Sequence, residues 1–413
     1  MKPPELNTRR FVLQNGMTLL CARHDAAPVL AVRTFVDAGQ RFETSPGVSA
    51  MTGRVLGAGA GERTETELCE AIEFQGGTLE TSGVGFGMKF LSRDMEFAIG
   101  IAADLLCRPG FDKSAVERER RIALSELQAE GDRARQRASL KLNAELYGDH
   151  PFARHAYGSA DDLRAIDRDV VDSYHTRFFQ PGNTLLAIAG RIDFDEVHET
   201  IANALGDWPD LPVSKPAVRE PPKIGAAREH LITVAREQVH LYLGHLGIRR
   251  TDPDYLALSV LDAILGSGAG FSDRLSARVR DELGLAYTVN ATITSSAGME
   301  PGLFRAYVGC APENWQRARE EILAAVRRVA SEPVSNEEIE AARAHLAASL
   351  LFDLQTAEDV AIALLAIERF GLGFEHPAHY MKRLDVVTPD DVMMATRRHL
   401  HPDALTTIAL GPV

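Results

Sequence analysis

Residues 166–190 read IDRDVVDSYHTRFFQPGNTLLAIAG, and residues 387–411 read VTPDDVMMATRRHLHPDALTTIALG. At a constant offset of 221 residues, Asp169, Arg177, Pro181 and Gly190 match Asp390, Arg398, Pro402 and Gly411. Each segment predicts a helix, a turn that contains proline, and a final apolar strand. Self-similarity over a distance of this size indicates that the chain contains two copies of one domain.

The sequence around these segments predicts the same order of elements in each half. Each half starts with strand-like segments, continues with a helix and further strands, and then becomes rich in charged helices. The matching ranges are 19–36 and 231–246, 47–56 and 255–265, 78–91 and 286–293, and 114–128 and 336–352. This order favours an α+β fold in which helices cover one face of a mixed β-sheet.

A proline-rich segment near the middle of the chain predicts the boundary between the halves. Residues 208–223 contain five prolines, and proline at this density resists both helix and sheet. We therefore expect two similar domains, residues 1–215 and 223–413, related by pseudo-twofold symmetry. A chain of 413 residues is long enough for each domain to bury its own core.

Composition excludes several classes of partner. The net charge is −13, and the acidic and basic residues are mixed, which disfavours nucleic acid and anionic membranes as partners. No apolar run is long enough to span a bilayer. The four cysteines form no CxxC pair and indicate buried thiols in a reducing compartment. The first residues contain no apolar signal segment, so we expect a cytoplasmic protein, or a periplasmic one if a signal was trimmed.

Familiar catalytic motifs are missing from the sequence. HExxH and HxxEH, which place two zinc ligands one helical turn apart, do not occur, and Ala202 stands where His198-Glu199 would need a second histidine. The GxSxG elbow of serine hydrolases and the phosphate loop GxxxxGK[ST] are also absent. We find no nucleophile–base pair or cofactor motif that would support unrelated chemistry.

Glu119 and Glu126 form the first constellation that could carry chemistry. They lie seven residues apart in the helical stretch ERERRIALSEL, about two turns, so both carboxylates share one face. On spacing alone, the neighbouring arginines favour a solvated face of ion pairs.

Arg280 and Tyr287 form the second constellation, in FSDRLSARVRDELGLAYTV (residues 271–289). Leu275, Val279 and Leu283 make an apolar stripe that ends at a glycine, which predicts a helix followed by a strand. A cation and a phenol at such a junction can hold a carbonyl oxygen or an oxyanion. The alternative is a surface Arg–Glu pair beside a half-buried tyrosine.

These residues, in this order, resemble the pitrilysin/insulinase family of zinc peptidases, which includes mitochondrial processing peptidase. AGQRFETSPGVSAMTGRVLGAGAGERT (residues 38–64) resembles the segment around the zinc helix, and VERERRIALSEL (116–127) resembles the helix with the glutamate ligand. HPFARHAYGSADDL and FFQPGNTLLAIAG resemble the segments that close the first domain. GAGFSDRLSARVRDELGLAYTV (268–289) resembles the segment with the family's Arg/Tyr pair.

The chain departs from the family at the zinc helix. Ala50, Gly53 and Arg54 stand where active members carry HxxEH, and the resemblance places Glu126 at the position of the glutamate ligand. One carboxylate does not make a catalytic zinc site, which needs about three protein ligands. We therefore expect no metal in this chain.

The resemblance implies a role in a split enzyme. In such enzymes one subunit keeps HxxEH, and the other supplies the Arg/Tyr pair. We expect this chain to be the non-metal subunit of a heterodimeric zinc metallopeptidase, inactive alone, that binds peptide or unfolded polypeptide and contributes Arg280 and Tyr287 to the zinc site of its partner. The alternative is a non-catalytic scaffold or peptide-binding protein of the same fold.

Arg54 raises a further expectation about the vacant metal position. Ala50 and Arg54 lie one helical turn apart and are expected to face the helix with Glu119 and Glu126. A guanidinium can bridge a carboxylate through two hydrogen bonds, so Arg54 can replace the charge of the metal. In the alternative, Arg54 points to solvent and the glutamates pair with neighbouring arginines.

Overall fold

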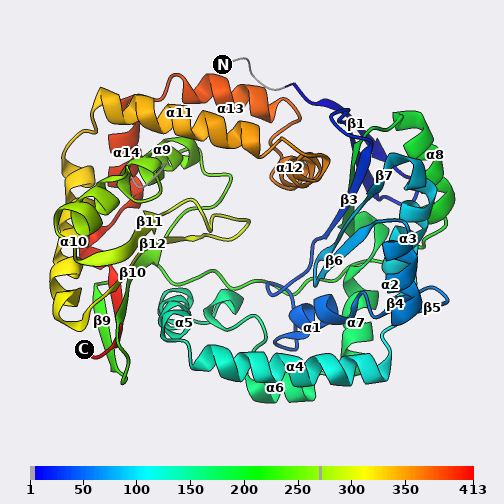
Figure 1. Cartoon of the computed structure of the whole chain (residues 1–413), viewed down its shortest axis with the longest axis horizontal. Coiled ribbons are helices and arrows are strands. Elements are labelled where there is room, and N and C mark those ends of the chain that lie inside the picture. The colour runs from blue at the N-terminus through cyan, green and yellow to red at the C-terminus, as the bar shows by residue number, and fades with distance from the viewer. Residues whose placement is uncertain (1–4, 269–271) are drawn as a thin grey trace.

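The computed structural model describes residues 5–268 and 272–413, so the first residues of the segment GAGFSDR, 269–271, lie outside the described residues. Its two halves face each other, each with one large sheet, and repeat the same arrangement about an approximate twofold axis (Figure 1). The α+β fold expected from the sequence is confirmed.

The first half contains a six-stranded mixed sheet in the order β1-β2-β8-β3-β7-β6. Its strands are β1 (Asn7–Val12), β2 (Thr18–Arg23), β3 (Val29–Val36), β6 (Thr78–Ser82), β7 (Gly85–Leu91) and β8 (Thr184–Gly190), with a small separate ladder of β4 (Gly59–Ala60) and β5 (Arg63–Thr64). Its helices are α1 (Val48–Val55), α2 (Glu65–Phe74), α3 (Met95–Cys107), α4 (Lys113–Gly131), α5 (Ala134–Tyr147), α6 (Ala160–Ala165), α7 (Arg168–Phe178) and α8 (Phe194–Leu205).

The second half contains a five-stranded mixed sheet in the order β11-β12-β10-β13-β9. Its strands are β9 (Arg228–Thr233), β10 (Val239–Leu246), β11 (Ala286–Thr292), β12 (Leu303–Cys310) and β13 (Thr406–Gly411). Its helices are α9 (Tyr255–Leu265), the π-helical segment η5 (Ser276–Glu282), α10 (Trp315–Ser331), α11 (Asn336–Phe352), α12 (Ala357–Arg369), α13 (His376–Leu384) and α14 (Pro389–His399).

The repeated sequence segments form the same structure in both halves. Each is a helix, α7 or α14, followed by a short turn that begins at the matched proline and by a central strand, β8 or β13. Both strands end at a glycine with positive φ, Gly190 at 148° and Gly411 at 153°. A Cβ at these two positions would lie 2.1 Å and 2.6 Å from carbonyl oxygens of the neighbouring strand. A side chain at either position would clash with the backbone, so glycine is required at the end of β8 and of β13.

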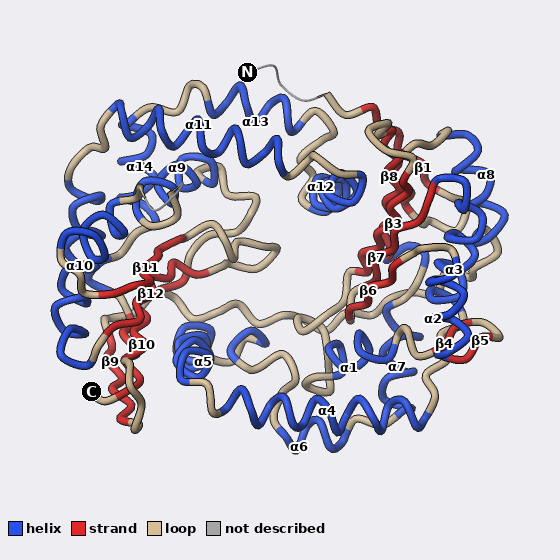
Figure 2. The backbone as a smooth tube through the Cα atoms, viewed as in Figure 1, coloured by secondary structure: helices blue, strands red, loops and turns tan. Residues whose placement is uncertain are grey.

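The two halves exchange one helix each. The first sheet packs one face against its own helices, while Leu20 and Ala31 on its other face pack against Ala361 and Leu364 of α12, which comes from the second half. Conversely, Leu142 of α5 belongs to a cluster with strands β10, β12 and β13 of the second sheet. Figure 2 shows α12 and α5 on the sides of the sheets that face the opposite half. The sequence predicted helices on one face of each sheet. The structure adds a helix from the other half on the second face of each sheet.

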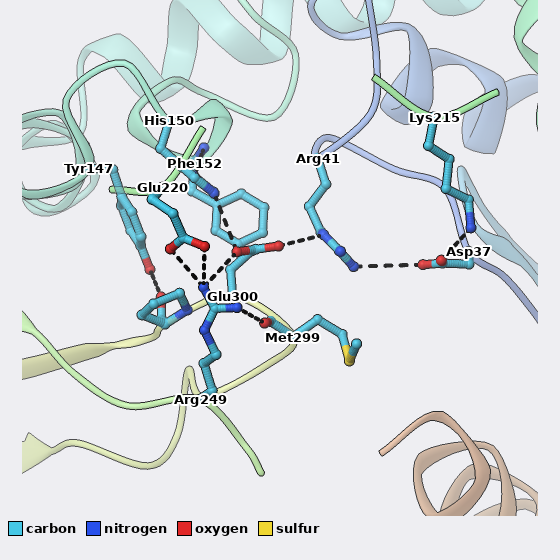
Figure 3. A network of polar contacts seen from close by, with 11 residues as sticks. Asp37, Arg41, Tyr147, His150, Phe152, Lys215, Glu220, Arg249, Met299 and Glu300 are labelled. Carbon is cyan, nitrogen blue, oxygen red and sulfur yellow. Dashed lines mark hydrogen bonds and ion pairs between the residues drawn. The ribbon is translucent and has the colours of Figure 1, made fainter. Parts of the chain in front are cut away.

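A network of polar contacts joins the halves near Glu300, in the loop between β11 and β12. This buried carboxylate lies 3.0 Å from Nε of Arg41 in the first half and 3.5 Å from Arg249 in its own half (Figure 3). Arg249 also binds Glu220 of the proline-rich segment at 2.8 Å. The junction is therefore tied by charges from both halves and from the segment between them.

The proline-rich segment lies between α8 and β9, and no helix or strand interrupts it. This agrees with the predicted boundary, although the limits 1–215 and 223–413 stay a prediction. Within residues 5–268 and 272–413, no helix is both long and apolar enough to cross a membrane.

Candidate functional site

Helix α1 carries the positions that differ from the zinc motif, and a buried carboxylate fixes its start. Glu43 accepts hydrogen bonds from the amides of Gly47 and Ser49 at 3.1 and 3.2 Å. Burial raises the pKa of Glu43 above its usual value, although these amide bonds act in the opposite direction. A carboxylate at the N-terminal end of a helix accepts hydrogen bonds from amides that have no partner within the helix. Its negative charge is also favourable beside the positive end of the helix dipole.

Gly53 lies where α1 touches the turn between β6 and β7. A Cβ at this position would lie 2.6 Å from the amide nitrogen of Gly83 and 2.7 Å from the carbonyl carbon of Ser82. The Thr81 hydroxyl also donates a hydrogen bond to the Gly53 carbonyl at 2.7 Å. This helix therefore has no space for the catalytic glutamate of the zinc motif unless the neighbouring turn moves.

Arg54 reaches both glutamates of α4, as one of the two sequence-based alternatives predicted. Its Nε donates to Glu119 at 3.0 Å, and its Nη1 donates to Glu126 at 2.8 Å. A second bond from Nη2 to Glu126 measures 3.3 Å, and Nη1 also donates to the Tyr157 hydroxyl at 2.9 Å. The expectation that Arg54 pairs with Glu126, Glu119 or both is confirmed, since it pairs with both, and the alternative in which it points to solvent is wrong.

We define the Arg54 cluster as Arg54, Glu119, Glu126 and Tyr157, which together contain one cation and two carboxylates. Side-chain exposure is 19% for Arg54, 15% for Glu119 and 45% for Glu126. Arg118 also binds Glu119, at 3.2 Å, so the more buried carboxylate has two cationic neighbours. Burial lowers the pKa of Arg54, but hydrogen bonds to Tyr157 and Glu126 outweigh it and raise that pKa above its usual value.

The Arg54 cluster does not fit a zinc ion. Both histidine ligands are absent, and the guanidinium occupies the hydrogen-bonding atoms of the remaining carboxylates. Among the described residues, one group of three ligand-type side chains lies close enough to hold a metal: Asp252, Asp254 and His399. Arg398 already forms an ion pair with Asp254 there, so a cation is present without a metal.

Sequence reasoning missed Tyr157 as a member of the cluster. Its hydroxyl accepts from Arg54, and its ring lies under the same guanidinium at 5.9 Å from the centroid. Tyr157 belongs to the segment HPFARHAYGSADDL, and the carbonyl of this tyrosine touches the start of α1 at Gly47. The family resemblance of this segment was the one feature of the sequence that could have pointed to Tyr157. The contact between Tyr157 and α1, however, depends on the tertiary fold.

Arg280 lies on η5, which is π-helical where the sequence predicted an ordinary helix. It forms an ion pair with the adjacent Asp281, with Nε and Nη2 at 2.8 and 3.3 Å from the carboxylate oxygens. The Asp281 hydrogen bond is the main cause that raises the pKa of Arg280, and Tyr287 contributes through charge.

Tyr287 lies on an irregularity of the edge strand β11. Ala286 pairs with Cys310 and Thr288 pairs with Gly309, so Tyr287 is an extra residue between two paired ones. Bulges of this kind redirect a side chain out of the regular sheet pattern. Tyr287 is 90% exposed, which is unusual for a large aromatic side chain.

Two family models match successive parts of the chain. The model "Insulinase (Peptidase family M16)" matches residues 19–160, and "Peptidase M16 inactive domain" matches residues 165–346. The chain belongs to peptidase family M16. An uncharacterized zinc protease of Mycobacterium leprae is 25% identical over 93% of this chain and 87% of its own length. The beta subunit of the mitochondrial-processing peptidase of Saccharomyces cerevisiae is 25% identical over 98% and 91%.

Solved structures of M16 proteins share the fold. A protein from Pseudomonas fluorescens, described as a peptidase M16 inactive domain, has a TM-score of 0.91 at 24% identity, over 99% of this chain and 98% of that one. A protease from Helicobacter pylori has a TM-score of 0.88 at 17% identity, over 98% and 99%. The family and the fold expected from the sequence are therefore both confirmed. In this M16 chain an arginine–glutamate cluster joins α1 to α4.

Proposed function

We propose that the chain is the non-metal subunit of a heterodimeric zinc metallopeptidase, in which it binds peptide and completes the active site of a partner that carries HxxEH. The observation that carries this proposal is the Arg54 cluster. Its carboxylates are already neutralised by arginine, whereas a catalytic zinc site needs three protein ligands and an open position. Hydrolysis would therefore depend on the partner's metal site.

The exposed Tyr287 supports a contribution to that partner site. A tyrosine that is 90% exposed is available to a second molecule, and the guanidinium of Arg280 adds a fixed positive charge in the same half. We assign Arg280 to orienting the scissile carbonyl and Tyr287 to donating a hydrogen bond to the tetrahedral oxyanion. Arg280 would first exchange Asp281 for substrate, which costs little because ion pairs at exposed positions are weak.

The edge strand β6 supports the binding of peptide. It forms the open edge of the first sheet and joins α1 through the bond between Thr81 and Gly53. An extended peptide can add to such an edge through main-chain hydrogen bonds, largely independent of its sequence. This mode suits a protein that handles unfolded segments.

The test compares turnover in the reconstituted complex. The chain is purified with a homologous HxxEH subunit, and cleavage of a fluorogenic peptide is measured with wild type, Arg280→Ala, Tyr287→Phe and the control Arg317→Ala, an exposed arginine on α10. Loss of one oxyanion donor typically lowers kcat by about 10²–10³-fold, so the first two variants should lose activity while the control keeps it.

Two outcomes contradict the proposal. If Arg280→Ala and Tyr287→Phe leave turnover unchanged, the chain is a scaffold or a peptide-binding protein of the same fold. Zinc-dependent peptidase activity from the chain alone would also exclude the assignment, because it would require a metal site in this chain.

A further inference from the structure

A cavity of about 420 Å³ lies in the second half, between the start of α9 and helix α13. We call it the basic cavity. The residues that decide its chemistry are Arg250, Tyr255, His376, Lys382 and Arg383. No member of the Arg54 cluster lines it, and neither Arg280 nor Tyr287 does, so it is separate from the site described above.

Arg250 is held by stacking in the wall of the basic cavity. Its guanidinium carbon lies 3.8 Å from the centroid of the Tyr255 ring and 6.0 Å from that of Phe370. Among the ion pairs of residues 5–268 and 272–413, none joins the Arg250 side chain to a carboxylate. Stacking fixes the plane of a guanidinium and leaves the N–H groups at its edge available, which suits binding of an oxyanion.

Two more cations face the basic cavity from α13. Lys382 and Arg383 are both exposed, and no ion pair with a carboxylate is found for either in the described part of the chain. One carboxylate, Asp252, lines the cavity. It accepts a hydrogen bond from the amide of Asp254 at 2.9 Å and lies 3.7 Å from Nε2 of His399. The cavity therefore carries an excess of positive charge.

His376 responds to this excess. Burial, followed by the charges of Arg250, Arg383 and His379, lowers its pKa to about 4. His379 itself forms a contact of 3.2 Å with Glu375 on the same helix. The imidazole of His376 is thus neutral at pH 7, and the net charge of the cavity comes from the arginines and the lysine.

The start of α9 forms part of the same wall. Tyr255 and Leu256, in the first helical turn, both line the cavity. Asp254, which precedes them, makes no capping bond to the helix through its side chain, because its carboxylate binds Arg398 and His399 instead. An uncapped helix start carries partial positive charge and favours an anion.

We propose that the basic cavity binds a phosphate group, either as free phosphate or as part of a small phosphate ester. Phosphate carries more than one negative charge at neutral pH and offers several oxygens, which matches two cations on α13 and one before α9 better than a single carboxylate does. This site is independent of the function proposed above, since it needs neither the partner subunit nor a peptide.

The experiment is calorimetric titration of the full chain with inorganic phosphate, ATP and acetate at constant ionic strength. Saturable binding of phosphate or ATP is expected, with no binding of acetate; the tighter of the two ligands identifies free phosphate or a phosphate ester as the source. Because bonds between charged groups dominate, Arg250→Gln and the double variant Lys382→Gln/Arg383→Gln should each weaken binding by about 10-fold or more. Arg317→Gln, an exposed arginine in the same half, serves as the charge-matched control.

Three results would overturn the proposal. These are no saturable binding of phosphate or ATP, binding of acetate with the same affinity, and unchanged affinity in both variants. Circular dichroism checks folding, and the double variant decides the question if Arg250→Gln fails to fold, because the side chains of Lys382 and Arg383 are exposed.

Discussion

Replacing Arg54 by alanine removes the cation that forms ion pairs with both Glu119 and Glu126. The cost depends on what each carboxylate keeps. Glu126 is 45% exposed and can turn to water, so its share should be below about 1 kcal/mol. Glu119 is 15% exposed but keeps Arg118, so we place its share at about 1–2 kcal/mol, below the 3–5 kcal/mol typical of a fully buried pair.

Together these shares predict that Arg54→Ala lowers the free energy of unfolding by about 1–3 kcal/mol. The assay is urea denaturation followed by circular dichroism, read as a lower midpoint at an unchanged slope. Arg164→Ala is the control, because Arg164 pairs with Asp161 where both side chains are largely exposed.

Double-mutant cycles separate the two contacts of Arg54. The coupling with Glu119→Gln should exceed the coupling with Glu126→Gln, since the first carboxylate is the more buried one. The reasoning is refuted if Arg54→Ala is as harmless as Arg164→Ala. It is equally refuted if the losses from Arg54→Ala and Glu119→Gln simply add.

Three further predictions concern metal and pH. The chain purified without chelator should contain far less than one zinc per molecule by metal analysis. The double variant Ala50→His/Arg54→His should take up zinc, since the side chain at position 54 already reaches Glu126 at 2.8 Å. Adding Glu126→Ala to this double variant should abolish the uptake. Zinc in the wild type, or no zinc in the double variant, would contradict this view of the site. Burial lowers the pKa of His245 to about 4, and its Nε2 accepts from the His401 amide at 3.1 Å. Because the unfolded state binds this proton more readily, stability should fall as pH drops from about 6.5 to about 4, and His245→Gln should flatten that dependence in urea unfolding.

The sequence predicted the fold well where local pattern and repetition carried the information. The repeat at residues 166–190 and 387–411 predicted α7, β8, α14 and β13, and the charged periodicity predicted α4 and α11. It did not predict the exchange of α5 and α12. An apolar stripe shows that a helix is covered on one side, but it does not show which sheet covers it. That choice depends on contacts between residues more than a hundred positions apart.

The site was predictable to a similar degree. The spacing of Glu119 and Glu126 predicted one shared face, and the resemblance placed Arg54 opposite it. Tyr157 was not predictable from spacing, because a loop brings it to Arg54 from another part of the chain. The exposure of Tyr287 also escaped prediction, since it depends on one extra residue in the pairing of β11 with β12.

The exchange of helices has a consequence for synthesis on the ribosome. Helix α5 ends at residue 147, but β13, the last strand it packs against, ends at residue 411. At about 5–20 residues per second, α5 waits roughly 10–50 s for its partner. During that time its apolar side chains, and the sheet face that α12 later covers, are open to water. The first sheet is covered only after α12, which ends at residue 369, has been made, so a nascent first half is a predicted client for chaperones.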